Sequence, residues 1–384
     1  MLFDLIDYSI LRLLWWALLG VLLIGFAIMD GFDLGVATLL PFVARNDTER
    51  RIAINSIGPV WDGNQVWLVL GAGAIFAAWP PIYATAFSGF YIAMFLVLAA
   101  LILRPVGFDF RNKLPSPRWR RNWDYALFIG GAVPSLVFGV AVGNVLLGVP
   151  FTIDADQRIF YEGSGLFELL NPFGLLAGIV SLTMLAAHGG SYLALKSDGP
   201  VRERARKATM LLAPVSAAFF ILGGLWIASG ISGYAITSPV DPSGPSNPLL
   251  KTVTTGVGLW TSVYVKYPAA AIAPLLGIAG LFGAALLAKL RHEGLAFIAS
   301  AAGIAGVILT AGVSLFPFIM PSSLAPNASL TVWDSSSSHR TLFVMAVCAL
   351  IFVPIVLGYT SFIFHVLRGK LTAQHIEKGN KSLY

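Results

Sequence analysis

The stretch "WDGNQVWLVLGAGAIFAAW", residues 61–79, places a carboxylate and two amides directly before an apolar run. Pro59 suits the first turn of a helix. It would put Asp62 one turn further in, where the helix dipole stabilises a carboxylate. The run is close to the roughly 20 mainly apolar residues that cross a bilayer. The stretch therefore predicts a membrane helix over 58–79 that opens on a polar turn.

The whole chain has the composition of a membrane protein. Of its 384 residues, 57% are hydrophobic and 11% are charged, against roughly 25% charged in soluble domains. Long apolar stretches recur along it, and we expect one all-α membrane domain over residues 1–384 with nine transmembrane helices. The predicted spans are 11–29, 58–79, 82–103, 124–147, 167–193, 208–231, 267–288, 295–319 and 341–367.

The positive charges predict the orientation of these spans. Twenty Lys and Arg residues fall in one set of alternating loops and four in the other, with Arg12 at a boundary. By the positive-inside rule the N-terminus is periplasmic and the C-terminus cytoplasmic. Because the cations lie in short clusters between spans, the net charge of +6 does not indicate nucleic-acid binding. The long outer loops, about 232–266 and 320–340, are expected to form an ordered outer surface or a partner contact.

Five ionisable residues lie within or at the ends of the spans, and such residues are functional candidates. Asp30 and Asp33 are expected to end the first helix, Asp62 opens the second, Arg104 ends the third and Asp109 follows it. The predicted orientation puts all five on the cytoplasmic side, as one polar cluster. For Asp30 and Asp33 three interpretations stay open: a solvated helix end, an ion pair with Arg104, or proton handling.

Asp62 and Trp67, within the opening stretch, each have two interpretations. Asp62 is either a structural carboxylate at a helix N-terminus or, in a partly dehydrated site, a group that transfers protons. Trp67 either packs between helices or lines a path for a small molecule or quinone. Spacing alone does not separate these alternatives.

The sequence offers few groups that could hold a cofactor. A haem with two axial histidines needs facing residues at matched depth, and His188 and His365 are the only histidines inside predicted spans. The single cysteine excludes an internal disulfide. No HExxH motif, P-loop, nucleophile elbow or metal-spaced carboxylate cluster occurs. We expect no metal site and no redox centre in this chain.

Ten stretches, in order along nearly the whole chain, resemble subunit II of cytochrome bd ubiquinol oxidase. They are "GFDLGV" at 31–36, "RNDTERR" at 45–51, "INSIGPVWDGNQVWL" at 54–68, "FAAWP" at 76–80, "AFSGFY" at 86–91, "RPVGFDFR" at 104–111, "LNPFGLLAG" at 170–178, "LFPFIMPSS" at 315–323, "NASLTVWD" at 327–334 and the terminal "SLY".

This resemblance implies a subunit of a bacterial inner-membrane terminal oxidase, folded as two four-helix bundles plus one peripheral helix. Its partners would be a haem-bearing subunit I, a small single-helix subunit and the lipid bilayer. Haem b and haem d would lie in subunit I, with none attached to this chain, which would not be catalytic alone. The substrate would be ubiquinone or menaquinone in its quinol form, and some members also bind a structural quinone. Quinol oxidation outside and dioxygen reduction with cytoplasmic protons would build a membrane potential without a pump.

The resemblance also implies roles for single residues. Asp62 and Asp109 match proton-path positions, and Trp67 matches the residue beside an oxygen route. The polar positions near the interface with subunit I are matched by Asp30, Asp33 and Arg104. Some members have His immediately before the Trp-Asp pair where this chain has Val60, so a relay through that imidazole is not available here.

Two other functions remain compatible with the residues alone. A secondary transporter or ion channel could carry an intramembrane acidic path, although transporters often show paired halves and broken helices near the membrane centre. A scaffold that only holds subunit I would use the same acids as interface groups.

Overall fold

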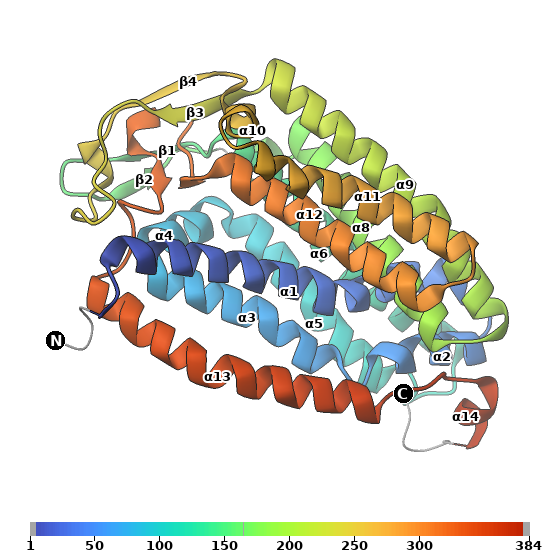
Figure 1. The fold of residues 1–384 in the computed structure, drawn as a ribbon. Coiled ribbons are helices and arrows are strands. Elements are labelled where there is room, and N and C mark those ends of the chain that lie inside the picture. The colour runs from blue at the N-terminus through green and yellow to red at the C-terminus, as the bar shows by residue number, and fades with distance from the viewer. Residues whose placement is uncertain (1–4, 164, 379–384) are drawn as a thin grey trace.

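Long helices running side by side make up most of the molecule in the computed structural model, which describes residues 5–163 and 165–378 (Figure 1). Eight helices in this described part are long and apolar enough to cross a membrane. The all-α membrane fold is thereby confirmed. α3 (Trp61–Ala78) has 18 residues but a polar first turn, which lowers its mean hydropathy, and it stays our predicted ninth span.

The long helices pack as two groups with one helix at the edge. The first group contains α1 (Tyr8–Val43), α3, α5 (Tyr91–Phe110) and α6 (Pro117–Leu147), and the second contains α8 (Pro172–Lys196), α9 (Gly199–Gly230), α11 (Ile272–Lys289) and α12 (Glu293–Leu315). Contacts of α8 with α1 and α6 join the groups. α13 (His339–Val366) lies at the edge beside α3 (Figure 1), and nearly all of its side chains are at least partly exposed. This arrangement matches the two four-helix bundles and the peripheral helix implied by the resemblance.

The first helix is much longer than predicted. α1 continues to Val43 instead of ending near residue 29, so Asp30 and Asp33 lie inside it. Gly35 explains the close packing here, because a Cβ at this position would lie 2.0 Å from the backbone oxygen of Leu185 on α8. Small residues of this kind let membrane helices approach closely.

Two of the other predicted spans are each divided into two helices. The predicted span 82–103 is divided into α4 (Pro80–Gly89) and α5, with Phe90 between them. The predicted span 167–193 is divided into α7 (Leu166–Leu169) and α8, which begins at Pro172. Pro172 lacks the backbone N–H that would continue a helix from α7, so α8 begins at this residue. The break between α4 and α5 has no proline beside it and follows Gly89, a residue that weakens a helix. α3 begins after Pro59, not around it, and Asp62 therefore lies in its first turn.

The two ends of the bundle differ in kind. The short helices α2 (Asp47–Ile57) and α14 (Ala373–Lys378) lie at the end away from the N-terminus (Figure 1). The basic loops of the sequence gather at this end, which we call the basic end. The opposite, outer end carries the strands.

Three two-stranded antiparallel sheets and short helices cover the outer end. The sheets are β1 (Phe151–Ile153) with β2 (Ile159–Tyr161), β3 (Ser232–Ile236) with β4 (Val253–Val257), and β5 (Phe318–Met320) with β6 (Leu330–Thr331). The short helices are α10 (Ser262–Lys266), η2 (Pro248–Leu250), η3 (Leu259–Thr261), η4 (Pro268–Ala271) and η5 (Pro326–Ala328). Both long outer loops are ordered, as expected for an outer surface.

Arg12 of α1 ties these outer loops to the helices. Its guanidinium is fully buried. It donates to the backbone oxygens of Pro242 at 2.6 Å and Gly244 at 3.0 Å, and to the hydroxyls of Ser246 at 3.0 Å and Ser336 at 2.8 Å. One side chain thus joins the first helix to both long outer loops.

Candidate functional site

Three helices of the first bundle bring five polar side chains together inside the protein. Asp30 and Asp33 come from α1, Asn64 and Gln65 from the first turn of α3, and Arg104 from α5; we call this set the buried polar cluster. Arg104 Nη2 donates to Asp30 Oδ1 at 2.7 Å and to Gln65 Oε1 at 3.2 Å. Asn64 Nδ2 donates to Asp33 Oδ2 at 2.8 Å.

The burial of this cluster corrects one prediction and confirms another. Asp30, Asp33 and Arg104 have no exposed area, and Asn64 is 1% exposed, so the interpretation of the two acids as a solvated helix end is wrong. The predicted ion pair with Arg104 is confirmed for Asp30. Gly130 of α6 makes room for this arginine, because a Cβ there would lie 3.0 Å from Arg104 Cγ.

Four polar atoms of the cluster have no hydrogen-bond partner in the described structure. They are Asp30 Oδ2, Asp33 Oδ1, Arg104 Nε and Arg104 Nη1. More than nine in ten buried polar groups in proteins are hydrogen-bonded to protein or water. Such a concentration of unsatisfied atoms at one place is therefore unusual, and it points to a ligand or to internal water.

Asp62 and Asp109 lie outside this cluster, contrary to the expectation of one group of five. Both are exposed, and within the described residues neither forms a hydrogen bond or ion pair. Their chain neighbours Trp61 and Phe108 are in ring contact at 5.9 Å between centroids. The two carboxylates therefore stand at neighbouring ends of α3 and α5, close to the basic end.

Trp67 packs between α3 and α1. Its side chain is 8% exposed and belongs to a core that includes Phe26 and Val97. A Cβ at Gly25 would lie 2.5 Å from Cε3 of the indole ring, so the ring fills the space that this glycine leaves. This contact supports helix packing as one role of Trp67; a role beside an oxygen route stays a prediction.

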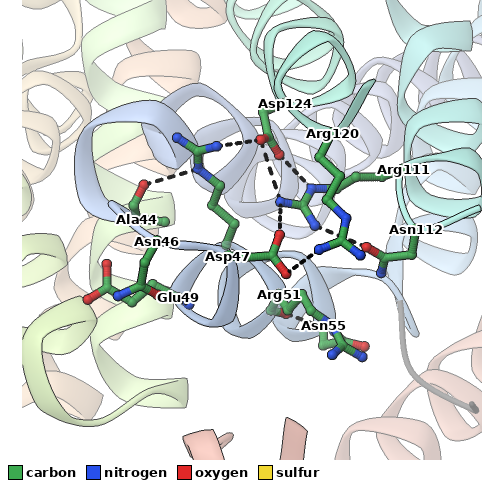
Figure 2. A network of polar contacts seen from close by, with 11 residues as sticks. Ala44, Asn46, Asp47, Glu49, Arg51, Asn55, Arg111, Asn112, Arg120 and Asp124 are labelled. Carbon is green, nitrogen blue, oxygen red and sulfur yellow. Dashed lines mark hydrogen bonds and ion pairs between the residues drawn. The ribbon is translucent and has the colours of Figure 1, made fainter. Parts of the chain in front are cut away.

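A second set of ionic side chains lies at the basic end. Asp47, Arg50, Arg111, Arg120 and Asp124 form the Arg111 network, and Figure 2 labels all of them except Arg50. The guanidinium of Arg111 lies between two acids, with Nε donating to Asp124 Oδ1 at 2.6 Å and Nη2 to Asp47 Oδ1 at 2.9 Å. Arg50 also reaches Asp124, at 2.7 Å, and Arg120 reaches Asp47, at 3.0 Å. The network ties α2 to the ends of α5 and α6.

The local sequence "RNDTERR" places α2 for these contacts. The side chain of Asn46 caps the helix by accepting from the backbone N–H of Glu49 at 2.9 Å, and Glu49 reaches back to the backbone N–H of Arg45 at 2.6 Å. This pattern is close to a capping box, with Glu49 accepting from the residue before the N-cap. Glu49 also pairs with Arg204 of α9 at 2.7 Å. Burial alone would raise the pKa of Glu49, but these hydrogen bonds outweigh it and lower the pKa below its ordinary value.

Sequence reasoning missed the Arg111 network. The usable signal was Asp124, an acid at the start of a predicted span that directly follows a loop with six cations. An acid in that position needs a cationic partner, and Arg111 was within reach along the chain. The missing information was the position of α2, which no apolar pattern predicts.

The histidines do not fit axial haem ligation in this chain. His188 is fully buried, with Nδ1 2.7 Å from Ser300 Oγ and Nε2 3.0 Å from the backbone oxygen of Ile28. His365 is exposed near the end of α13. Among the described residues no group of three or more His, Cys, Asp or Glu side chains could hold a metal ion.

Comparisons with known proteins cover almost the whole chain. The family model described as cytochrome bd terminal oxidase subunit II matches residues 11–367. The cytochrome bd-I ubiquinol oxidase subunit 2 of Escherichia coli K12 is 50% identical, over 99% of this chain and 100% of that protein. The cytochrome bd ubiquinol oxidase subunit 2 of Bacillus subtilis is 34% identical, over 94% and 96%.

A solved structure agrees with the fold. The bd oxidase from Geobacillus thermodenitrificans matches with a TM-score of 0.67 over 93% of this chain and 98% of that chain, at 16% identity. At this identity the likeness supports the architecture alone. From the family match and the full-length identity together, the chain belongs to the cytochrome bd terminal oxidase subunit II family and is a subunit of an oxidoreductase complex.

Proposed function

We propose that this chain works in a bacterial inner membrane as the non-haem subunit of a quinol oxidase, next to a haem-bearing subunit I. The identity of 50% over the full length to a ubiquinol oxidase subunit supports this assignment. The oxidase takes electrons from a quinol, ubiquinol or menaquinol, and reduces dioxygen to water. The positive-inside distribution of cations supports a cytoplasmic basic end.

The haems b and d belong to subunit I in this proposal. Both ring nitrogens of His188 already contact protein oxygens, and His365 stands on the exposed side of an edge helix. Neither residue offers a free nitrogen inside a pocket. We therefore assign this chain no step at a haem, and limit its part to supporting subunit I and delivering substrates.

The apolar sides of α3 and α5 form the surface that we assign to subunit I. Val69 and Phe76 on α3 are 66% and 59% exposed, and Phe95 and Ile102 on α5 are 66% and 61% exposed. Asp62 lies on the same stripe of α3, four residues before Val66, so a partner that covers the stripe would enclose this carboxylate. Lipid and a small single-helix subunit cover the remaining apolar surface.

The exposed acids Asp62 and Asp109 carry protons from the cytoplasm toward subunit I. The supporting observation is their position: two carboxylates at neighbouring helix ends near the basic end, without a partner in the described chain. Asp124, by contrast, is held by Arg111 and Arg50. Val60 is buried beside the start of α3, so water must serve where other members of the family have an imidazole.

Trp67 would border the oxygen route in this proposal. It is the large side chain on α3 that faces Gly25, where the lack of a Cβ leaves space only for the ring. Dioxygen is small and apolar, so it partitions into an apolar contact between helices more readily than into a polar one. A smaller side chain at position 67 should change the KM for dioxygen more than the kcat.

The proton role is tested in the whole oxidase complex with Asp62→Asn, Asp109→Asn and the double variant. We expect slower quinol-driven oxygen consumption with normal haem content, because the amide keeps the shape but cannot carry a proton. Asp156→Asn is the matched control, since this acid is 73% exposed in the outer β1–β2 turn. Full activity in the double variant would contradict the proton path, and loss of haem would instead assign both acids to assembly.

A further inference from the structure

The buried polar cluster contains more acids than cations. Two carboxylates, Asp30 and Asp33, face one guanidinium, Arg104, and none of the three has exposed area. With both acids ionised, the cluster would carry one uncompensated negative charge inside the protein. Buried charges are strongly unfavourable unless they are paired. A further positive charge is therefore needed at this place.

Neighbouring groups do not supply that charge. His188, whose ring contacts α1, meets a backbone carbonyl and a serine hydroxyl, and the neutral ring satisfies both. Tyr192, stacked on Phe32 of α1, donates its hydroxyl to the backbone oxygen of Ser56. Arg111, two turns beyond Arg104 on α5, is held by the two acids of its own network. On α3 the cluster receives only amides.

The positions of the unsatisfied oxygens indicate where the charge sits. Asp33 Oδ1 and Asp30 Oδ2 both lack partners, and residues three apart on a helix face the same side. Two ionised carboxylates on one helix face in a buried place repel each other when no cation or donor lies between them. A hydrogen on one of them turns the repulsion into a hydrogen bond, directly or through one water molecule.

We infer that the buried polar cluster binds one proton, carried on Oδ1 of Asp33 as a neutral carboxylic acid. Asp30 is the ionised partner because it accepts from the guanidinium at 2.7 Å, whereas Asp33 accepts only from a neutral amide. The free Nε and Nη1 donors of Arg104 are suited to one or two internal water molecules in the same space. The site is thus a proton and water site.

Infrared spectroscopy of the intact oxidase complex at neutral pH tests the inference. The difference spectrum of wild type minus Asp33→Asn should contain a carboxylic-acid carbonyl band that shifts in D₂O. Asp156→Asn, an exposed outer acid, should give no such band. If Asp33→Asn removes only carboxylate bands, both acids are ionised and a metal cation balances them, which overturns the proposal.

A second measurement keeps the test decisive if one variant assembles poorly. Wild-type complex labelled with ¹³C at the aspartate carboxyl groups must show the same acid band at lower frequency, and an unmoved band would overturn the assignment to aspartate.

The two acids should also differ in their effect on assembly. Asp33→Asn imitates the neutral acid, so its complex should accumulate near the wild-type level, whereas Asp30→Asn leaves Arg104 without its anion. Equal losses in both variants would overturn the placement of the proton.

This site does not depend on a proton path through Asp62 and Asp109. The infrared band reports the charge of the cluster at rest, and turnover reports transport along the path. A normal band with full turnover in Asp62→Asn would leave the inference standing while the proposed path fails.

Discussion

The buried polar cluster and the Arg111 network are made of the same two residue types and share helix α5, yet their charge balance is opposite. The cluster has two acids to one arginine, all without exposed area. The network has three arginines to two acids, and three members reach solvent: Asp47 is 43%, Arg120 32% and Arg50 27% exposed. Every charged residue of the network has at least one ionic partner.

The difference shows what access to water permits. At the basic end water and salt screen an excess charge. The ion pairs of the network can therefore stabilise the helix contacts without a balanced charge. Inside the bundle the excess has no solvent, and it must be removed by a bound proton or ion. Aspartate and arginine side chains therefore connect helices in the Arg111 network, whereas two helical turns away on α5 they form a proton-binding site.

The largest effect should follow from removing the cation of the buried polar cluster. Arg104→Gln leaves the buried carboxylate of Asp30 without its guanidinium, and breaking a buried ion pair costs roughly 3–5 kcal/mol. We expect much less assembled complex in membranes and a lower thermal midpoint of what remains. Arg104→Lys, which keeps the charge but not the planar fork, should recover part of the loss. Wild-type yield and midpoint in Arg104→Gln would mean that the cluster is hydrated despite its burial.

A smaller effect is expected in the Arg111 network. Asp124→Asn weakens the bonds from Arg50 and Arg111, but Asp47 still pairs with Arg111, so the loss should be about 2 kcal/mol, the typical value of a hydrogen bond to a charged group. The thermal midpoint of the purified complex measures it. Asp47→Asn is the comparison, and it should cost less because the side chain of Asp47 is 43% exposed, against 5% for Asp124. Equal shifts of the thermal midpoint in the two variants would show that burial of the acid does not determine how much its ion pairs stabilise the complex.

The smallest effect concerns pH. Because the hydrogen bonds from Arg204 and Arg45 lower the pKa of Glu49 in the folded protein, its ionised form adds stability that is fully present above its ordinary pKa of 4.5. That stability is lost as the pH falls through the lowered value. The thermal midpoint of the wild-type complex should therefore decline more steeply below pH 4.5 than that of Glu49→Gln. Parallel curves would assign the acid sensitivity to other carboxylates.

Apolar length and loop charge predicted the membrane class, the approximate positions of the spans and the ordered outer loops. They predicted too short a first helix, because Asp30 and Asp33 interrupt the apolar run, and a pattern of apolar length ends the span at such a break. Burial of those acids depends on the close approach of α8 at Gly35 and on the amides of α3, contacts between distant segments that no local pattern contains. For the same reason the sequence predicted Asp62 and Asp30 in one cluster. In the structure the first turn of α3 buries Asn64 and exposes Asp62.

The resemblance to a known family added what local patterns could not. It predicted two bundles and an edge helix, which the packing of α1 to α13 confirms. It did not predict the Arg111 network, since family motifs identify residues without pairing them. Asp47 and Asp124 were both visible in the sequence, but only the position of α2 brings them to one arginine (Figure 2).

Arg12 gives the chain a fixed order of assembly. The partners of its guanidinium lie 230 to 324 residues later in the sequence. At synthesis rates of about 5–20 residues per second, the first helix therefore waits on the order of tens of seconds for Ser336. During that time the guanidinium has only the ring of Tyr8 on its own helix, 3.7 Å away in the finished fold, and water or lipid headgroups as partners. The edge helix α13 begins at His339, so the outer surface is completed only when synthesis reaches this helix. A chain that stops earlier leaves the guanidinium of Arg12 without its partners in the outer loops.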